Sequence, residues 1–368
     1  MVRTVINIVH LQPIVPHYRE EFFSILGEKT NQTIYVYEDL STAQSASFNL
    51  AHIHCRHIAS KMLAGRILFY NPFKLLSSRY DVLVLMLNFT HFTSWLLLFT
   101  KFIHRKKIIL WGQGISVKRY LQEERRPDWK LKWQIALADG IWFYMNKEKK
   151  QWQNLFPKKP MVALNNTLTD VDKMMEYRSD LSIADLKKKY HITQDFILIF
   201  CARFGNNYRR VDLLLKAIEQ LDAKRYGFVI IGAGKNKPSF LPYTNVYDFD
   251  ALYDVTIKRE LFALSDIYFQ PGWVGLSIVE AMAYGKPVFT FKRSEEIKQC
   301  VEYSYLESGV NGMIFADIDE CIEYINFISK EEIKNLGNNA RCYVKQYLSM
   351  EQMVENAMSV LDQIVEKC

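Results

Sequence analysis

Short runs of apolar residues alternate along the first half of the chain with longer segments in which apolar residues recur every three or four positions. The short runs predict β-strands, and the longer segments, such as His17–Glu28 and Phe92–Phe102, predict helices. Strands that alternate with helices favour a parallel sheet with helices on both faces. The predicted strands of this half are Val5–Val9, Thr33–Tyr37, Val82–Leu87, Lys107–Leu110 and Gly140–Tyr144.

The same alternation returns after a charged helical segment, Asp172–Asp195, in which Ser182 is a candidate N-cap. A helix is expected at Val255–Leu264 among the strands of this half. A length of 368 residues suits two domains rather than one. The sequence therefore predicts an α/β protein of two domains with parallel sheets. The predicted strands are Phe196–Ala202, Gly227–Ile231, Asn245–Asp248 and Asp266–Phe269.

One stretch of the second half combines a strand end, a glycine-bearing loop and a short helix. Gly272 turns the chain, Gly275 allows a close backbone approach, and a helix is expected from about Leu276 to Tyr284, with Gly285 as its C-cap. Amides at the start of such a helix are an anion site, and Glu280 would lean back toward the same ligand. The alternative is an ordinary strand–turn–helix unit with an exposed glutamate.

A second loop carries positive charge. Arg203 and Arg209 flank a glycine loop between a buried strand and an amphipathic helix, where they would form a phosphate cradle. One such arginine alone could be a surface ion-pair partner, but two around one loop favour the cradle. The nearby Gly232-Ala-Gly234 resembles the opening of a dinucleotide fingerprint, yet a lysine occupies its third glycine position, so we do not interpret it as NAD-binding.

Loops at the strand ends of the first half hold further candidates. His17, Tyr18 and Arg19 follow two prolines and would lie at the mouth of the first helix, although a structural role is the alternative for a lone histidine. Gln113 lies between two glycines, the second of them Gly114, directly after a buried strand. This pattern suggests backbone held close to a ligand, or a plain turn.

Composition narrows the classes of partner. The net charge of +7 favours an anionic partner such as a nucleotide, a phospholipid surface or an acidic substrate, and no motif that reads DNA or RNA accompanies it. The six cysteines are scattered without a CxxC pair, which argues against a zinc site and a disulfide framework and fits a reducing cytosol. The N-terminus has the pattern of a first strand and not of a signal peptide.

The first half also raises the question of a membrane. Val82–Ile103 is mostly apolar, but polar residues interrupt it, and a strand followed by a helix explains it better than a transmembrane span. Basic residues interleaved with Phe, Leu and Trp resemble a surface that lies on anionic lipid headgroups, and a solvated basic face is the alternative. The basic residues are Lys61, Arg66, Lys74, Arg79, Lys101, Arg105, Lys106, Lys107, Arg125 and Arg126.

Taken in order, these signals resemble the retaining family-four glycosyltransferases of the GT-B fold over nearly the whole chain. The resemblance rests on Arg203 with the run Arg209–Leu214, on Gly232–Gly234, and on the block from Gly275 to Pro287. An Asn-rich segment, Asn165–Asp170, and a late turn, Gly309–Gly312, add to it. A subgroup acting in bacterial surface-polysaccharide assembly has a similar Pro-Gly-x-Val-Gly-Leu sequence.

The resemblance implies two Rossmann-like domains with parallel sheets facing across a cleft, an acceptor-side domain (residues 1–170) and a nucleotide-sugar-binding domain (171–345). A nucleotide-diphosphate-sugar would bind between them, and a C-terminal helix (346–368) would cross back to the first domain. Arg203 and Arg209 would neutralise the leaving diphosphate, and Glu280 would bind the ribose. The loop residues Gly272, Gly275, Leu276, Ser277 and Ile278, together with Gly234, Tyr18, Gln113 and Gly114, would contact substrates. In this family the acceptor is thought to attack on the face from which the leaving group departs.

The family works without a bound metal, so no cofactor or metal is expected here. The chain contains three Asp-x-Asp triplets, at Asp170–Asp172, Asp248–Asp250 and Asp317–Asp319, but each falls in a polar connecting stretch where solvated aspartates are common. The expected location is cytoplasmic, peripheral on the inner membrane face.

Two positions depart from the family pattern. Gly272 stands where the family usually has a glutamate that contacts the donor sugar, and Gln113 stands where many members have a histidine. The first departure suggests a donor gripped differently, such as a deoxy or N-acylamino sugar. Besides an active transferase that adds a sugar to a polysaccharide or lipid-linked acceptor, two alternatives stay open: a catalytically silent assembly subunit and a nucleotide-sugar epimerase.

Overall fold

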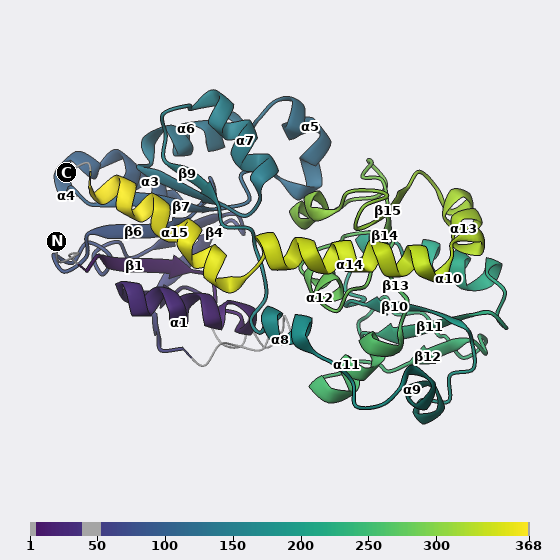
Figure 1. Ribbon diagram of the computed structural model, residues 1–368. Coiled ribbons are helices and arrows are strands. Elements are labelled where there is room, and N and C mark those ends of the chain that lie inside the picture. The colour runs from purple at the N-terminus through teal and green to yellow at the C-terminus, as the bar shows by residue number, and fades with distance from the viewer. Residues whose placement is uncertain (1–4, 39–52, 367–368) are drawn as a thin grey trace. The chain divides into compact units, whose positions relative to one another are not determined.

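The computed structural model describes residues 5–38 and 53–366 (Figure 1). Contacts divide the chain into two compact units, each with its own sheet. Unit 1 comprises Met1–Thr169 and Met350–Cys368, and unit 2 comprises Asp170–Ser349.

Unit 1 is built on a parallel sheet with the strand order β3-β2-β1-β6-β7-β8-β9. A separate antiparallel hairpin pairs β4 with β5. The sequence pattern did not predict this hairpin. The strands are β1 (Asn7–Gln12), β2 (Asn31–Val36), β3 (Cys55–His57), β4 (Ser60–Leu63), β5 (Ile67–Tyr70), β6 (Val82–Met86), β7 (Lys107–Gly112), β8 (Gly140–Phe143) and β9 (Met161–Ala163).

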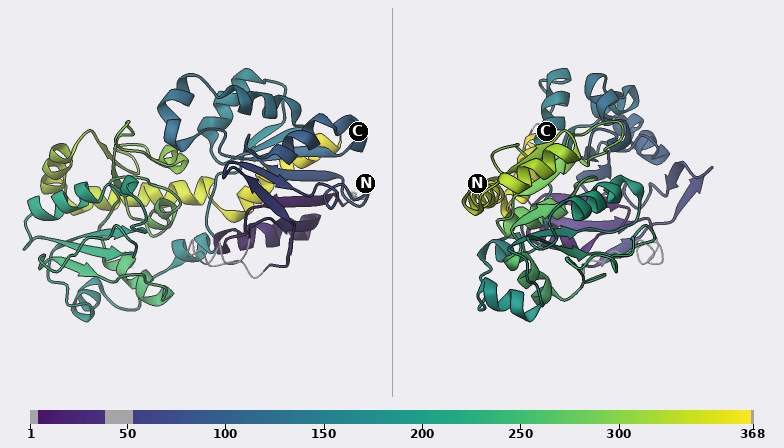
Figure 2. Two further views of the ribbon diagram at one scale, coloured as in Figure 1. Left: turned by 180° about the vertical axis from the view of Figure 1, so that it is seen from behind. Right: turned by 90° about the vertical axis from the view of Figure 1, so that its right-hand side faces the viewer.

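Helices cover both faces of this sheet (Figures 1 and 2). On one face α1 and α15 pack over buried side chains that include Phe22 and Val354. On the other face α3, α6 and α7 cover a second cluster that includes Leu97, Ile135 and Trp152. The helices are α1 (Glu20–Lys29), α3 (Phe92–Phe99), α4 (Lys101–His104), α5 (Tyr120–Arg125), α6 (Trp129–Leu137), α7 (Asn146–Leu155) and α15 (Met350–Val365), and the short 3-10 turns are η1 (His17–Arg19) and η2 (Val117–Arg119).

Unit 2 is built on a parallel sheet with the order β12-β11-β10-β13-β14-β15. One core cluster joins this sheet to α10, α13 and the start of α14. The strands are β10 (Phe196–Cys201), β11 (Tyr226–Ile231), β12 (Val246–Asp248), β13 (Ile267–Phe269), β14 (Val288–Phe291) and β15 (Gly312–Phe315). The helices are α8 (Val171–Glu176), α9 (Ile183–Lys189), α10 (Val211–Gln220), α11 (Val255–Leu264), α12 (Ser277–Ala283), α13 (Ile318–Phe327) and α14 (Lys330–Tyr347), with η3 (Asn207–Arg209) and η4 (Val301–Tyr305).

The predicted α/β class with two parallel sheets is confirmed, but several boundaries differ. The helix predicted at Phe92–Phe102 is two helices, α3 and α4, that adjoin at Thr100. Both the amide (3.0 Å) and the hydroxyl (2.7 Å) of Thr100 donate to the Leu96 carbonyl at the end of α3. The charged segment Asp172–Asp195 also forms two short helices. Its predicted N-cap is confirmed, since the Ser182 hydroxyl accepts a hydrogen bond from the Asp185 amide.

Each sheet has a point at which its strand order reverses. In unit 1 the reversal lies between β1 and β6, and in unit 2 between β10 and β13. Loops that leave the carboxyl ends of two such strands diverge to opposite faces and leave a crevice in which α/β proteins bind ligands. The two loops singled out in the second half of the sequence are those that follow β10 and β13.

Candidate functional site

The loop after β10 presents two arginines at the reversal point of unit 2. Arg203 follows the strand and is exposed, whereas Arg209 ends η3 and is mostly buried. The Arg209 guanidinium donates to the Trp273 carbonyl (2.7 Å) in the loop after β13. Arg210 instead forms an ion pair with Asp212 (2.7 Å) at the start of α10. The two loops therefore meet at Arg209.

Several neighbouring groups shift the pKa of Arg209. Burial lowers its pKa, and the positive charge of Arg203 lowers it further, although Tyr268 and the thiols of Cys201 and Cys300 oppose these effects. The two like charges repel each other, and an anion bound beside them would relieve this repulsion. This pair of like charges is what a phosphate-binding loop requires.

Two fully buried side chains hold the loop after β13. Gln299 accepts a hydrogen bond from the Val274 amide (2.9 Å), and Gln270 makes four further bonds. In Gln270 both ends of the amide are used. The Gln270 amide oxygen accepts hydrogen bonds from the hydroxyls of Tyr268 (2.6 Å) and Ser277 (2.9 Å). Its amide nitrogen donates to the carbonyls of Gly272 (3.1 Å) and Trp273 (2.8 Å). With donor and acceptor groups both satisfied, Gln270 fixes the path of the loop that contacts Arg209.

Gly272 is required by the contact between the two loops. A Cβ at this position would lie 2.3 Å from the Tyr208 carbonyl oxygen and 3.0 Å from a side-chain carbon of Arg210. Beside it, the rings of Tyr208 and Trp273 stack with centroids 4.8 Å apart. A glutamate at position 272 does not fit unless η3 moves, which gives a steric reason for the departure from the family pattern.

Gly275 has the opposite surroundings. A Cβ there would meet only the side chain of Cys300, at 3.8 Å, which is ordinary van der Waals contact. The chain's own packing therefore does not require a glycine at 275. In the following turn the Ile278 amide donates to the Gly275 carbonyl (3.1 Å) and the Ser277 hydroxyl is used by Gln270, so these groups already serve the loop itself.

Glu280 lies in the first turn of α12 and is 9% exposed, so it is not the surface glutamate of the alternative interpretation. Its carboxylate forms an ion pair of 2.7 Å with Lys258 of α11. Burial alone would lower the pKa of Lys258, but the Cys201 thiol and the Glu280 carboxylate raise it above its usual value. Sequence reasoning missed Lys258, because nothing in the pattern of its helix linked it to a residue 22 positions later.

Close packing also explains why residue 234 is a glycine. Its φ is 147°, and a Cβ would lie 2.5 Å from the Phe204 carbonyl oxygen. Gly232 is similarly pressed against the Ala202 carbonyl, at 2.0 Å. The Gly-x-Gly pattern thus lets the loop after β11 lie directly on the loop after β10, next to Arg203.

The remaining candidates belong to unit 1. Gln113 lines a cavity of about 340 Å³ beyond the ends of β6 and β7, together with Asn88, Arg119, Glu123 and Tyr144. Gly114 has a φ of 71°, and a Cβ there would lie 2.5 Å from the Phe143 ring. A tight packed turn therefore accounts for this glycine. Tyr18 is half-buried, and its carbonyl accepts from the Thr169 amide (3.2 Å).

Arg19 was expected at the mouth of the first helix, but it is buried (6% exposed). Its guanidinium donates to the Tyr144 hydroxyl (2.8 Å) and to the Gln12 amide oxygen (3.3 Å), and it lies 4.3 Å from the centre of the Trp111 ring. Hydrogen bonds and aromatic faces thus hold the cation inside unit 1.

The three Asp-x-Asp triplets have local partners. Lys237 forms ion pairs with Asp248 (2.7 Å) and with Asp250, Asp170 pairs with Lys173 (2.6 Å), and Asp317 caps α13. Within residues 5–38 and 53–366, no group of three or more His, Cys, Asp or Glu side chains has an arrangement that could hold a metal ion.

Comparison with known proteins relates unit 2 to a named family. Residues 195–331 match the model of the family "Glycosyl transferases group 1", a range that includes both loops of the reversal point. An uncharacterized glycosyltransferase of Haemophilus influenzae is 22% identical over 249 residues, and the alignment covers 62% of this chain and 62% of that protein.

Solved structures extend the similarity of fold to the whole chain. Alr3699/HepE of Anabaena, solved with UDP-glucose, superposes with a TM-score of 0.62 at 15% identity over 98% of each chain. The lipopolysaccharide outer core galactosyltransferase WaaB superposes with a TM-score of 0.63 at 12% identity, over 97% of this chain and 99% of that one. A putative UDP-N-acetylglucosamine 2-epimerase of Listeria monocytogenes shares the fold too, with a TM-score of 0.59 at 12% identity over 99% and 98%.

These findings confirm the predicted GT-B architecture. Together with the family match of residues 195–331, they support a glycosyltransferase. The fold alone also occurs in the epimerase, so the choice between activities rests on the residues of the site.

Proposed function

We propose that the protein transfers a sugar from a nucleotide-diphosphate-sugar to a polysaccharide or lipid-linked acceptor, with retention of anomeric configuration, in the assembly of a bacterial surface polysaccharide. The observation that carries this proposal is the pair Arg203 and Arg209 at the reversal point of the unit 2 sheet, inside the region that matches the family model. The HepE neighbour solved with UDP-glucose and the WaaB neighbour support the donor class and the polysaccharide context.

Leaving-group stabilisation is the chemistry these arginines would supply. The diphosphate gains negative charge as its bond to the sugar breaks, and donors that are already in place stabilise that charge without reorganising. Arg209 is held by the Trp273 carbonyl and by the packed loops, so it is preorganised for this task. We assign both arginines to the diphosphate and expect no metal in the site.

Glu280 is assigned to the ribose hydroxyls of the nucleotide. Lys258 pairs with its carboxylate and orients it, so that its oxygens can accept hydrogen bonds. Gly275 is assigned to close approach by the donor, because the protein's own packing leaves space on that side of its backbone. Tyr18, Gln113 and Gly114 remain candidates for acceptor contacts from unit 1.

Ligand binding tests the assignment most directly. UDP-, GDP- and dTDP-sugars are compared by thermal shift, since a donor that binds only the folded protein raises its melting temperature in proportion to the logarithm of its concentration. We expect one nucleotide to give a shift in the wild type and a smaller shift in Arg209→Ala. Arg225→Ala is the control, because Arg225 directly precedes β11 and so lies at the amino ends of the strands, opposite the two loops.

Different results favour the other functions. If no nucleotide shifts the wild type, the protein is an assembly subunit rather than a transferase. If a UDP-sugar binds and is converted to its epimer without an acceptor, the protein is an epimerase. Release of nucleoside diphosphate that depends on an added acceptor supports transfer.

A further inference from the structure

The outer surface of the α3–α4–α6 layer in unit 1 is apolar, although it faces away from the core. α3 contains no charged residue, and its inner side buries Leu97 and Leu98 while its outer side exposes Phe92, Leu96 and Phe99. A helix that is apolar on both sides is typical of a protein core or a lipid environment, not of contact with water.

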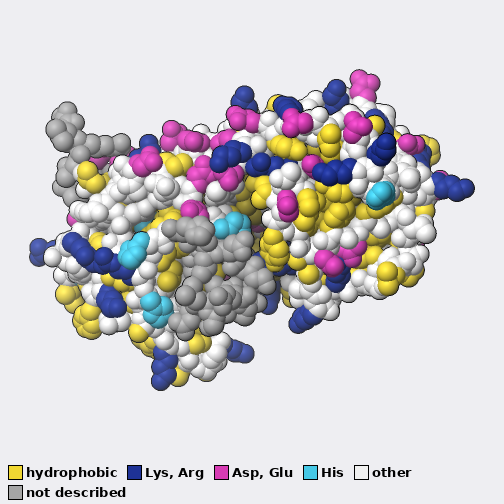
Figure 3. Space-filling view, turned by 90° about the horizontal axis from the view of Figure 1, so that it is seen from below, with side chains coloured by type: hydrophobic (Ala, Val, Ile, Leu, Met, Phe, Trp, Pro, Cys, Tyr) yellow, Lys and Arg dark blue, Asp and Glu magenta, His cyan; other side chains and the backbone are white. Residues whose placement is uncertain are grey.

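The exposed side chains of neighbouring elements extend this face. α3 packs against β5 and α6, the rings of Phe69 and Phe92 lie 4.9 Å apart, and Trp95 stacks on Phe99. We call this surface the apolar platform. On the face of unit 1 that Figure 3 shows, hydrophobic and basic side chains lie next to one another. Its exposed residues are Met62, Leu63, Ile67, Phe92, Leu96, Phe99, Phe102, Ile103, Trp129 and Trp133.

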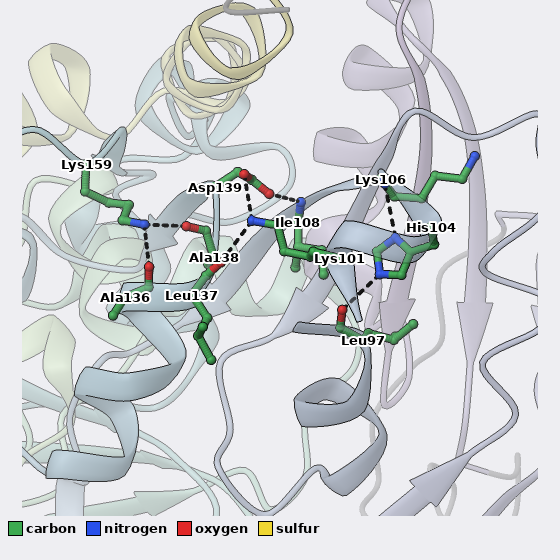
Figure 4. Close-up of polar contacts among 10 residues, drawn as sticks. All are labelled: Leu97, Lys101, His104, Lys106, Ile108, Ala136, Leu137, Ala138, Asp139 and Lys159. Carbon is green, nitrogen blue, oxygen red and sulfur yellow. Dashed lines mark hydrogen bonds and ion pairs between the residues drawn. The ribbon is translucent and has the colours of Figure 1, made fainter. Parts of the chain in front are cut away.

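Hydrogen bonds and an ion pair hold the helices of the platform in place (Figure 4). Lys101 of α4 donates to the last-turn carbonyl of Leu137 in α6 (3.0 Å) and pairs with Asp139 (2.8 Å), and Lys159 donates to the carbonyl of Ala136 (2.9 Å). These cations cap the C-terminus of α6, where carbonyls have no helical partner. His104 accepts from the Lys106 amide (3.1 Å) and bonds the Leu97 carbonyl (2.9 Å), which fixes α4 against α3.

Charge around the platform is strongly one-sided. Residues 53–122 contain eleven Lys and Arg residues and a single acidic residue, Asp81, so this stretch carries more positive charge than the whole chain, whose net charge is +7. Asp81 directly precedes the amino end of β6, where it accepts hydrogen bonds from Asn7. The exposed cations that border the platform are Lys61, Arg66, Lys74, Arg105 and Lys132.

We propose that the apolar platform docks the protein on an anionic lipid surface, with its aromatic and aliphatic side chains in the interfacial region and the bordering cations on the headgroups. Bulky apolar side chains surrounded by lysine and arginine are complementary to both layers of such a surface. Within residues 5–38 and 53–366, no helix is long and apolar enough to span a bilayer, and α3 and α4 fit attachment at its face. The inference stands independently of the proposed transfer reaction.

Vesicle flotation with the full chain tests this docking. Wild-type protein should float with phosphatidylcholine vesicles that contain phosphatidylglycerol and should bind pure phosphatidylcholine far more weakly. Phe102→Glu should weaken binding at least about tenfold, because it removes a large apolar side chain and adds a negative charge. Phe327→Glu in unit 2 is the matched control, since Phe102 is 79% and Phe327 83% exposed and both changes alter the net charge equally.

A second pair of variants isolates the electrostatic part. Lys132→Gln should weaken binding to the anionic vesicles about fivefold, whereas Lys216→Gln on the exposed side of α10 should leave it unchanged. Thermal shift with the donor nucleotide should be the same in all four variants, which separates a failure of docking from a failure of donor binding.

Three results would overturn the proposal. One is wild-type protein that ignores anionic vesicles, and another is equal binding by Phe102→Glu and Phe327→Glu. The third is a wild-type dimer in sedimentation equilibrium that Phe102→Glu converts to a monomer without any vesicle binding, because the occupant of the platform would then be a second copy of the chain.

Discussion

The two sheets reverse their strand order in the same way, but the chemistry at the two reversal points differs. In unit 1, β1 lies at the reversal point and carries His10 and Gln12, which are both buried. The nearby Arg19 is enclosed by aromatic rings and donates a hydrogen bond to Gln12. In unit 2 the corresponding loops carry Arg203 and Arg209 with the Lys258–Glu280 pair beside them. The same topology is thus a packed core feature in one unit and, in the other, the edge that we propose binds an anion.

The difference teaches that loop residues, not the sheet, decide what a reversal point does. In unit 2, glycines at 232, 234 and 272 let three loops touch one another through their backbones, and this contact brings the side chains of the loops together. In unit 1, the space near β1 is filled by rings from α1 and β8, such as Phe23 and Trp142. Variants at the unit 2 loops should therefore change donor binding and transfer. A variant at His10 in unit 1 should instead change the pH dependence of stability.

Arg209→Ala should have the largest effect, because it removes a charge assigned to the leaving diphosphate. We expect transfer to fall on the order of 10²–10³-fold, which corresponds to about 3–4 kcal/mol of transition-state stabilisation, with the circular dichroism spectrum unchanged. Initial rates with saturating donor measure the effect. Arg225→Ala should keep the wild-type rate, and equal rates for Arg209→Ala and the wild type would remove the arginine from the phosphate site.

Gly272→Ala tests whether the loops of unit 2 depend on their close contact. Its new methyl group would lie 2.3 Å from the Tyr208 carbonyl, so η3 must move and carry Arg209 with it. We expect the free energy of unfolding to fall by roughly 1–3 kcal/mol and the donor-induced thermal shift to shrink. Gly205→Ala, in the loop after β10 that Gly272 contacts, is the control, since a Cβ there meets no heavy atom within 4 Å. If both variants unfold alike, the contact is not tight in solution.

His10→Phe tests the packed nature of the unit 1 reversal point. Burial lowers the pKa of His10 from 6.5 to about 3, and neither ring nitrogen has a hydrogen-bond partner in the described part of the chain. As the pH falls below 6.5 the unfolded chain takes up a proton that the folded protein does not, so the stability present at neutral pH is lost progressively toward pH 3.

The size of this effect follows from the pKa difference. Between pH 7 and pH 4.5 the histidine should account for roughly 2–3 kcal/mol of the lost unfolding free energy. Urea titrations at the two pH values should show a smaller loss for His10→Phe, while His57→Phe on the exposed strand β3 should keep the wild-type dependence. An unchanged pH dependence in His10→Phe would mean that the ring is accessible to protons in the folded protein.

Much of this arrangement could be predicted from the sequence, and the reasons for the rest are physical. The strands, the two loops of unit 2 and the Gly285 C-cap follow from local signals: apolar runs, glycines and capping residues. The Lys258–Glu280 pair, the contact of Gly272 with Tyr208 and the burial of Arg19 join positions far apart in sequence, so no local signal reports them. The apolar outer side of α3 was visible only as one long hydrophobic run, because a sequence does not show which side of a helix packs inward.

Glu280→Gln is expected to have the smallest effect and to resolve the role of the ion pair. The uncharged amide should bind the ribose more weakly, so the donor KM should rise about tenfold with little change in kcat, since a ribose contact contributes equally to the ground state and the transition state. Lys258→Met should raise KM as well, by leaving the carboxylate without its partner.

The double variant distinguishes a shared role from two separate ones. If Lys258 acts only by orienting Glu280, the KM of Glu280→Gln combined with Lys258→Met should equal that of Glu280→Gln alone, giving a coupling energy of about 0.5–1 kcal/mol for this partly exposed pair. Effects that simply add would instead assign Lys258 its own contact with the nucleotide. An unchanged KM in Glu280→Gln would exclude the ribose role and leave Arg203 and Arg209 as the donor contacts of unit 2.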